Sequence, residues 1–356
     1  MIAAAAGVTA AGVARLAYSA LNQHPPGGPK AWSRTNHRGE PVTLLEGPAV
    51  AAGAIAGALA QAGLGSGTGS ASWRPGVAMA VGGAGAAAFG AYDDLTGSGD
   101  RRGFRGHFGA LRHGEVTTGA VKLGGIGVTG IVSAVLAGGS PVDIVINAGL
   151  VAGGANLLNL FDLRPGRAIK VAVASGVLAA PADAVGTAPP VGAALTLLPE
   201  DLGERAMLGD CGANALGAML GAAAAGLPRP ARIALLAGIA GLTAASEKVS
   251  FTQVIERTPA LRWLDLLGRP TGVREDGSPP RGVREDGSPP KGVREDGSPP
   301  KGVREDGSPP KGVREDGSPP KGGSGGGAPP RPAPSLAQAG TTVRSVEETD
   351  VTPPGE

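Results

Sequence analysis

Residues 91–97 read Ala-Tyr-Asp-Asp-Leu-Thr-Gly and end an apolar, charge-free run, residues 75–92, with two adjacent carboxylates, Asp93 and Asp94. Burying an ionised carboxylate in hydrocarbon is costly. A chain with two of them at the end of such a run therefore places them at a membrane surface, where a metal ion or a basic partner can reach them. The alternative is a solvated acidic turn after a soluble helix. Two further acidic stretches at the ends of apolar runs favour the membrane interpretation.

Composition divides the chain into two parts. Of its 356 residues, 42% are hydrophobic but only 3% are aromatic and 17% charged. Residues 1–270 are rich in Ala, Gly, Leu and Val, whereas residues 271–356 contain few apolar side chains. The net charge of +2 averages these parts and says little about partners. A single cysteine, Cys211, excludes an internal disulfide.

Nine apolar runs in the first part are candidates for membrane helices. They cover residues 2–21, 47–64, 75–92, 119–136, 142–160, 168–182, 184–198, 211–227 and 231–245. None has the charged face that a helix of a soluble bundle shows. The first run has no basic segment before it, which argues against a cleaved signal peptide. The glycines of residues 81–90 follow no β-branched strand, so a dinucleotide-binding loop is not favoured. The prediction is an all-α, polytopic membrane helix bundle of about nine transmembrane helices.

Basic residues are unequally distributed over the loops between these runs. If the first run enters from outside, the outer loops contain only Arg74, Arg229 and Arg232. The inner loops contain Lys30, Arg34, Arg38, Arg101, Arg102, Arg105, Arg112, Lys122, Arg164, Arg167, Lys170, Arg205, Lys248, Arg257, Arg262 and Arg269. Loops rich in Lys and Arg stay in the cytoplasm. The asymmetry predicts a multi-pass protein of the plasma (inner) membrane with its N-terminus outside and its C-terminal tail in the cytoplasm.

Acidic and amide side chains lie in these inner loops, at the ends of the apolar runs. They are Asp93 and Asp94 in the second inner loop, Asn156, Asn159 and Asp162 in the third, and Asp210 in the fourth. The spacing of the third set puts its members on one side of a helix end. Oxygen ligands of this kind suit Mg²⁺, which shares its shell with substrate phosphates, and the surrounding Lys and Arg suit a diphosphate. The pattern favours phosphoryl transfer between a soluble donor and a lipid-borne acceptor.

In their order and spacing these motifs resemble the polyprenyl-phosphate sugar-1-phosphate transferase superfamily. It includes phospho-N-acetylmuramoyl-pentapeptide transferase and undecaprenyl-phosphate N-acetylglucosamine-1-phosphate transferase. The resemblance rests on Asp-Asp-x-x-Gly at 93–97, Asn-x-x-Asn-x-x-Asp at 156–162, Gly-Asp-x-Gly at 209–212, and residues 34–47 and 114–122. Together these elements cover residues 1–270.

The resemblance implies a Mg²⁺-dependent enzyme of cell-envelope glycan (peptidoglycan) synthesis. Such an enzyme transfers a sugar-1-phosphate from a nucleotide sugar to a polyprenyl phosphate at the cytoplasmic membrane face. The catalytic residues implied are Asp93, Asp94, Asp162 and Asp210, with Asp94 and Asp210 as metal ligands. The substrate-binding residues implied are Arg34, His37, Arg38, Lys122, Asn156 and Asn159.

Three departures from the family pattern leave an alternative open. Asp162 is followed by Leu-Arg-Pro-Gly instead of a second acidic motif, residues 247–269 contain no histidine, and a tenth apolar run is absent. The alternative is a non-catalytic homologue that acts as a membrane scaffold in envelope assembly. A transporter is less favoured because the ionisable groups lie at helix ends, not at mid-membrane.

The second part of the chain is repetitive. Residues 272–321 are five copies of Gly-Val-Arg-Glu-Asp-Gly-Ser-Pro-Pro-Lys, with Arg281 replacing Lys in the first. Each copy is charge-balanced and nearly free of apolar side chains, so it cannot bury a core. The predicted domains are the transferase-like domain 1–270, disordered repeats 271–321 and a disordered Gly/Pro-rich tail 322–356. A homodimer and a cytoplasmic partner of the tail are left open, and no nucleic-acid partner is expected.

Overall fold

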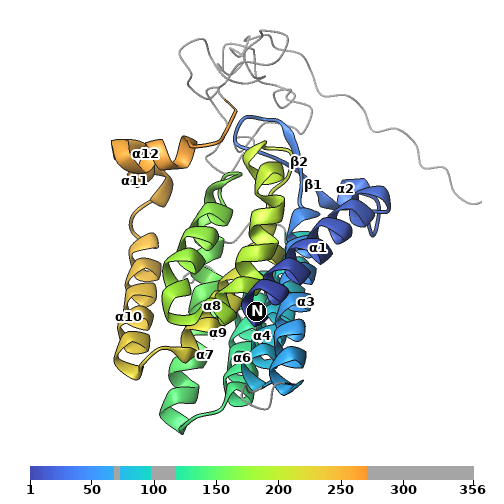
Figure 1. Ribbon diagram of the computed structural model, residues 1–356. Coiled ribbons are helices and arrows are strands. Elements are labelled where there is room, and N and C mark those ends of the chain that lie inside the picture. The colour runs from blue at the N-terminus through green and yellow to red at the C-terminus, as the bar shows by residue number, and fades with distance from the viewer. Residues whose placement is uncertain (68–72, 98–116, 271–356) are drawn as a thin grey trace, which may run out of the picture. The chain divides into compact units, whose positions relative to one another are not determined.

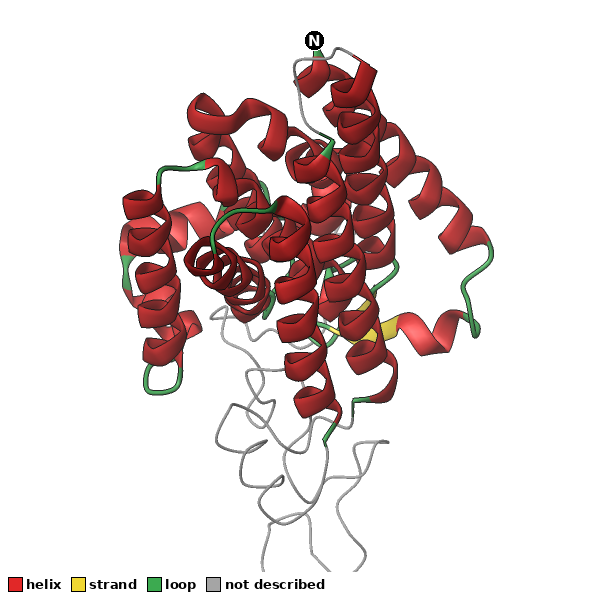
Figure 2. Cartoon of the chain, turned by 90° about the horizontal axis from the view of Figure 1, so that it is seen from below, coloured by secondary structure: helices red, strands yellow, loops and turns green. Residues whose placement is uncertain are grey.

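The computed structural model describes residues 1–67, 73–97 and 117–270. These residues are almost entirely helical, which confirms the all-α prediction (Figure 1). The strands that the structure describes form one short antiparallel ribbon of β1 (Ser33–Thr35) and β2 (Pro41–Thr43), in which Arg34 pairs with Val42 (Figure 2). The predicted repeats and tail, 271–356, and the basic residues Arg101, Arg102, Arg105 and Arg112 lie outside the described residues.

The elements follow the apolar runs closely. The long helices are α1 (Ile2–Gln23), α3 (Glu46–Gly67), α4 (Arg74–Thr96), α6 (Thr118–Ala137), α7 (Pro141–Phe161), α8 (Arg167–Leu202), α9 (Gly209–Ala223) and α10 (Arg229–Ser246). The short elements are α2 (Pro29–Trp32), β1 (Ser33–Thr35), β2 (Pro41–Thr43), the 3₁₀ turn η1 (Ala224–Gly226), α11 (Phe251–Arg257) and α12 (Pro259–Leu266).

Side-chain caps mark where two of the long helices begin. Thr117 accepts a hydrogen bond from the N–H of Ala120 at the start of α6. Ser140 and Asp143 form a reciprocal capping box at the start of α7, and Pro141 occupies the first helical position. Both devices satisfy N–H groups that a helix leaves without partners in its first turn.

Helix α8 folds back on itself at Asp183, whose backbone is non-helical (φ −151°, ψ 79°). The Asp183 carboxylate accepts a hydrogen bond from the N–H of Gly186 at 2.9 Å and so caps the second leg. The two ends of α8 meet, because the N–H of Gly166 donates to Asp201 Oδ1 at 2.7 Å. The two legs therefore run antiparallel, and they correspond to the two runs expected at 168–182 and 184–198.

Five helices of the described residues are long and apolar enough to cross a membrane: α1, α3, α6, α7 and α8. A sixth span results if α10 and α11, bent by 92° at their junction, count as one. Helix α9 has only 15 residues, fewer than a perpendicular span needs, and α4 is built largely from Gly and Ala, which are less apolar than Leu or Val. The structure thus supports a membrane helix bundle but does not confirm the number nine.

Helix α9 forms the core of the bundle, where it packs against α3, α4, α7 and α8. Nearly all of its side chains are buried. Glycine allows this close approach: a Cβ on Gly90 of α4 would lie 2.3 Å from the carbonyl oxygen of Asp210, and one on Gly217 would lie 2.2 Å from that of Gly154. The position of α9 relative to α4 and α7 is therefore set by backbone contact.

Inner-loop and outer-loop residues within the described ranges lie at opposite ends of the bundle. At one end, ion pairs join Arg38 to Glu204 and Arg164 to Glu256, so β1, β2 and α11 lie near the ends of α7 and α8 (Figure 1). At the other end, the side chains of Arg229 and Arg232 bind Asp143 of α7. The alternation expected from the charge pattern is thus present in the fold.

Candidate functional site

Lys122 of α6 lies between two carboxylates that come from two other helices. Its Nζ is 2.8 Å from Oδ2 of Asp93 in α4 and 2.5 Å from Oδ2 of Asp210 in α9. The three side chains are 13%, 17% and 26% exposed, respectively. Three of the residues expected at the site are therefore brought together at one end of the bundle, where their side chains have limited access to water.

Asp94 has a different position from its neighbour. Its two carboxylate oxygens accept hydrogen bonds from the N–H groups of Asp210 (3.0 Å) and Cys211 (2.9 Å), so it caps the N-terminus of α9 from outside that helix. Gly209 is required here, because it has φ +59° and a Cβ would lie 3.0 Å from Asp94 Oδ2. Asp94 thus orients the helix that carries Asp210.

Arg34 approaches the same site from β1. Its Nη2 donates a hydrogen bond to the backbone carbonyl of Asp94, and its Nη1 donates to the carbonyls of Ala31 and Ser33. The side chain is exposed, and it brings a positive charge to the end of α4. A basic group at this point suits an anionic ligand that is bound by a cation which the carboxylates hold.

Asp162, directly after α7, belongs to the same electrostatic environment. Burial raises the pKa of Asp162 well above its usual value, and the negative charges of Asp201, Asp210 and Asp94 raise it further. The backbone N–H of Gly209 opposes this rise. The Oδ1 atom of Asp162 is buried and has no hydrogen-bond partner among the described residues. Asp162 therefore lies within the electrostatic influence of Asp94 and Asp210, two of the other aspartates implied to be catalytic.

Two buried acids at the same end, Glu46 and Asp201, were not expected. Both have 0% exposure. Within the described part of the chain, neither oxygen of Glu46 has a hydrogen-bond partner. Asp201 accepts a hydrogen bond there only through Oδ1, from the N–H of Gly166. The signal that could have found them is the one that pointed to Asp93: each is an acid at the end of an apolar run on the inner side.

The loop between β1 and β2 presents His37 and Arg38. Arg38 forms an ion pair with Glu204 at 3.1 Å, and Glu204 has the left-handed backbone (φ 54°) that non-glycine residues adopt only rarely. Burial lowers the pKa of His37 to about 3, assisted by the positive charges of Arg164 and Arg269. His37 is therefore neutral near pH 7 and would contact a ligand by hydrogen bonding, not by charge.

The two asparagines of α7 do not join the carboxylates in the expected way. The Asn156 amide donates to Thr243 Oγ1 of α10 at 3.4 Å, so its side chain is directed at a neighbouring helix. Asn159 is half-buried, and its backbone carbonyl accepts the N–H of Asp162. Although Asn156, Asn159 and Asp162 are regularly spaced, their side chains therefore do not converge on one ligand.

The oxygen ligands present are compatible with Mg²⁺, although no group of three or more His, Cys, Asp or Glu side chains in the described ranges could hold a metal ion. Mg²⁺ commonly uses one or two carboxylates and completes its shell with water and substrate phosphates. Asp93 and Asp210 fit this role, since they already share a cation, the Lys122 ammonium. Asp94 fits it less well, because both of its oxygens bind the N-terminus of α9.

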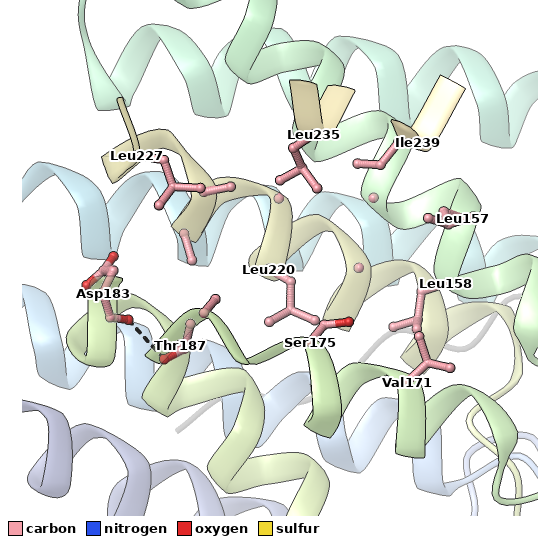
Figure 3. A pocket seen from close by; sticks show the side chains of 16 residues that line it. Leu157, Leu158, Val171, Ser175, Asp183, Thr187, Leu220, Leu227, Leu235 and Ile239 are labelled. Atoms are coloured by element: carbon pink, nitrogen blue, oxygen red, sulfur yellow. Dashed lines mark hydrogen bonds between the residues drawn. The ribbon is translucent and has the colours of Figure 1, made fainter. Parts of the chain in front are cut away.

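Two apolar cavities lie along α8. One, of about 360 Å³, is bounded by α8, α10, α11 and α12, with Arg167 and Lys170 at its polar edge. The other, of about 220 Å³, lies between α7, α8, α9 and α10 and is lined mostly by Leu, Ala and Gly (Figure 3). Both are lined by Val171. Apolar space therefore extends along α8 from the hinge at Asp183 toward the end that carries the carboxylates.

Comparisons with known proteins were made for the whole chain. No protein-family model matches it, and no curated protein matches it. What this chain does must therefore be inferred from its residues and their arrangement.

Proposed function

We propose that this chain transfers a sugar-1-phosphate from a nucleotide sugar to a polyprenyl phosphate at the cytoplasmic face of the plasma membrane, in cell-envelope glycan synthesis, with Mg²⁺. The observation that carries the proposal is the Asp93–Lys122–Asp210 arrangement. It combines two carboxylates for a metal with an ammonium for phosphate at one end of an apolar helix bundle. The motif resemblance to the polyprenyl-phosphate sugar-1-phosphate transferases points to the same chemistry.

The charges at this end suit a diphosphate. Asp93 and Asp210 would hold Mg²⁺, which would neutralise charge on the phosphates when bound. Lys122 and Arg34 offer donors to phosphate oxygens around that centre. Asp94 would act as a positioning residue through its hydrogen bonds to the first turn of α9. The proposal thus differs from the motif expectation by making Asp93, not Asp94, the partner of Asp210.

The apolar cavities support a lipid acceptor. A polyprenyl chain needs an apolar path, and its phosphate has to reach the carboxylate end of the bundle. The larger cavity offers Phe161, Leu242 and Leu264 among its lining residues, next to the basic edge at Arg167 and Lys170. We include in the proposal nine membrane segments, the two legs of α8 counted separately, with the carboxylate end in the cytoplasm because the basic loops are there.

A membrane scaffold that retains this fold without catalysis is the second candidate. It is favoured by the engagement of Asp94 and Asn156 in contacts within the protein. The two candidates differ in turnover, because only the enzyme releases a nucleoside monophosphate.

The test is incubation of the purified protein with polyprenyl phosphate, Mg²⁺ and a panel of nucleotide sugars, with nucleoside monophosphate release as the readout. Release that is lost in Asp210→Asn and retained in Asp143→Asn is the expected result. The control makes the same chemical change at the opposite end of the bundle, where Asp143 pairs with Arg229. Absence of release across a broad panel would overturn the enzyme and favour the scaffold. Full activity in Asp210→Asn would instead overturn the Asp93–Lys122–Asp210 site and leave the enzyme standing.

A further inference from the structure

We propose that Lys122 is an internal cation that occupies the Asp93–Asp210 pair in the metal-free protein and must leave before a divalent cation binds there. Once displaced, the Lys122 ammonium would be available to substrate phosphates. This inference rests on the proposed function, which makes the two carboxylates the metal ligands. It adds a competition between Lys122 and the metal for the two carboxylates, which the sequence motifs do not indicate.

Distance makes the two cations mutually exclusive. The Lys122 Nζ lies 2.8 Å from Asp93 Oδ2 and 2.5 Å from Asp210 Oδ2. A Mg²⁺ ion bound by the same two oxygens would sit about 2.0–2.1 Å from each. Such an ion would overlap the ammonium and would also repel it. Only one of the two can occupy the space between these oxygens.

Burial explains why Asp93 and Asp210 need a cation between them, whether it is the Lys122 ammonium or a divalent metal ion. The carboxylates of Asp93 and Asp210 are 17% and 26% exposed, so they are poorly screened from one another. Two carboxylates in such surroundings repel strongly without a positive partner, and removing one member of a buried charge pair is destabilising. The carboxylates cannot separate easily, because the carbonyl of Asp210 lies against Gly90 of α4. Exchange of the ammonium for a metal ion avoids a state in which the two negative carboxylates have no positive partner.

The position of Lys122 permits its departure. It lies one turn after Thr118, the first residue of α6. Helical side chains lean toward the N-terminus of their helix, so this ammonium can swing toward the end of the bundle at which α6 begins. The flexible four-carbon stem of lysine makes the movement possible without a change in the backbone.

The experiment measures Mn²⁺ binding by the purified full chain from the electron paramagnetic resonance signal of free Mn²⁺, with no substrate present. Lys122→Met removes the ammonium and keeps a side chain of similar length, so it should bind Mn²⁺ about 10-fold more tightly or better than wild type. Lys248→Met removes an exposed positive charge after α10 and should leave the affinity unchanged. Adding Asp210→Asn to Lys122→Met should abolish the tighter binding.

Thermal unfolding gives a second readout that does not depend on the signal of free Mn²⁺. Mn²⁺ should raise the Tm of Lys122→Met by more than that of wild type, because a ligand that binds the folded state more tightly stabilises it more. Equal or weaker Mn²⁺ binding by Lys122→Met, with wild-type binding still dependent on Asp210, would overturn the exchange and leave the metal site standing. No Asp210-dependent binding in either protein would overturn the metal site of the proposed function as well.

Discussion

Arg167, at the start of α8, and Asp265, in α12, form a two-point ion pair with Nε–Oδ1 2.9 Å and Nη2–Oδ2 3.2 Å. Both side chains are buried, at 4% and 7% exposure. Arg167 also donates to Thr252 Oγ1 of α11 at 3.0 Å. This cluster attaches α11 and α12 to the end of the bundle that carries the candidate site.

Asp265→Asn should destabilise the protein through this cluster. Removing one charge from a buried ion pair typically costs about 3–5 kcal/mol, because the other charge stays buried. Glu256→Gln is the matched control, since Glu256 pairs with Arg164 but is 47% exposed, and exposed pairs contribute about 0–1 kcal/mol. Unfolding in detergent, followed by helical signal, compares the two. Equal losses in both variants would contradict the structural role given to Asp265.

The same pair predicts a pH dependence. Burial tends to raise the pKa of Asp265, but hydrogen bonds from Arg167 and the charges of Arg269 and Arg167 outweigh it and hold the pKa below its usual value. The stabilisation is therefore fully present above the unfolded pKa of about 3.9 and is lost as the pH falls through the folded pKa. The stability gap between wild type and Asp265→Asn should shrink as the pH falls below about 4. A gap that widens in acid would contradict this sign.

Gly90→Val should disturb both folding and activity. A Cβ at this position would lie 2.3 Å from the carbonyl oxygen of Asp210, so α4 and α9 must move apart. Overpacking of this kind typically costs about 1–3 kcal/mol, and here it also separates Asp93 from Asp210. Gly238→Val is the control, because no atom lies within 4 Å of its added Cβ. Similar Tm values for both variants would show that α4 and α9 are not in this contact.

Asp93→Asn should mainly lower turnover, whereas Asp94→Asn should mainly lower stability. Asp94 caps α9, so its change should lower stability by about 0.5–2 kcal/mol, as the loss of a cap does. Asp93→Asn should have little effect on stability, because Lys122 keeps Asp210 as its charged partner. It should lower turnover by about 10²–10³-fold, the usual effect of losing one charge-stabilising group. Tm and monophosphate release on the same preparations separate the two effects. The reverse pattern would restore Asp94 as the metal ligand.

Membrane topology is tested by cysteines introduced one at a time. Ser66→Cys, at the end of α3, should react with an impermeant thiol reagent added to intact cells, because Ser66 is exposed and the proposed topology places it outside. Ser98→Cys and Ser278→Cys should be protected. The native Cys211 is buried and should contribute no background. Reaction of Ser278→Cys from outside would contradict a cytoplasmic tail.

Local sequence patterns were sufficient to predict the long helices and which charged loops lie at the same end of the bundle. Apolar runs predict helices because the repeating apolar pattern and the absence of charge are properties of each segment alone. The break of α8 at Asp183 was predicted for the same reason, as an interruption between two apolar runs. The sequence also indicated which charged residues share an end, because alternate loops of a bundle lie on opposite sides.

The partners of each site residue depend on the tertiary structure. Whether Lys122 meets Asp93 or Asp94 depends on how α4 and α6 are rotated about their axes, and adjacent residues on a helix point about 100° apart. Glycine contacts such as that of Gly90 with Asp210 set these rotations, yet a chain with 63 glycines does not mark which of them lie at an interface. For the same reason Asn156 was placed with the carboxylates by spacing, whereas the fold turns it toward Thr243. Sequence alone therefore predicted the long helices but not the short helices α2, α11 and α12, and only the packing of one helix against another decided which side chains meet.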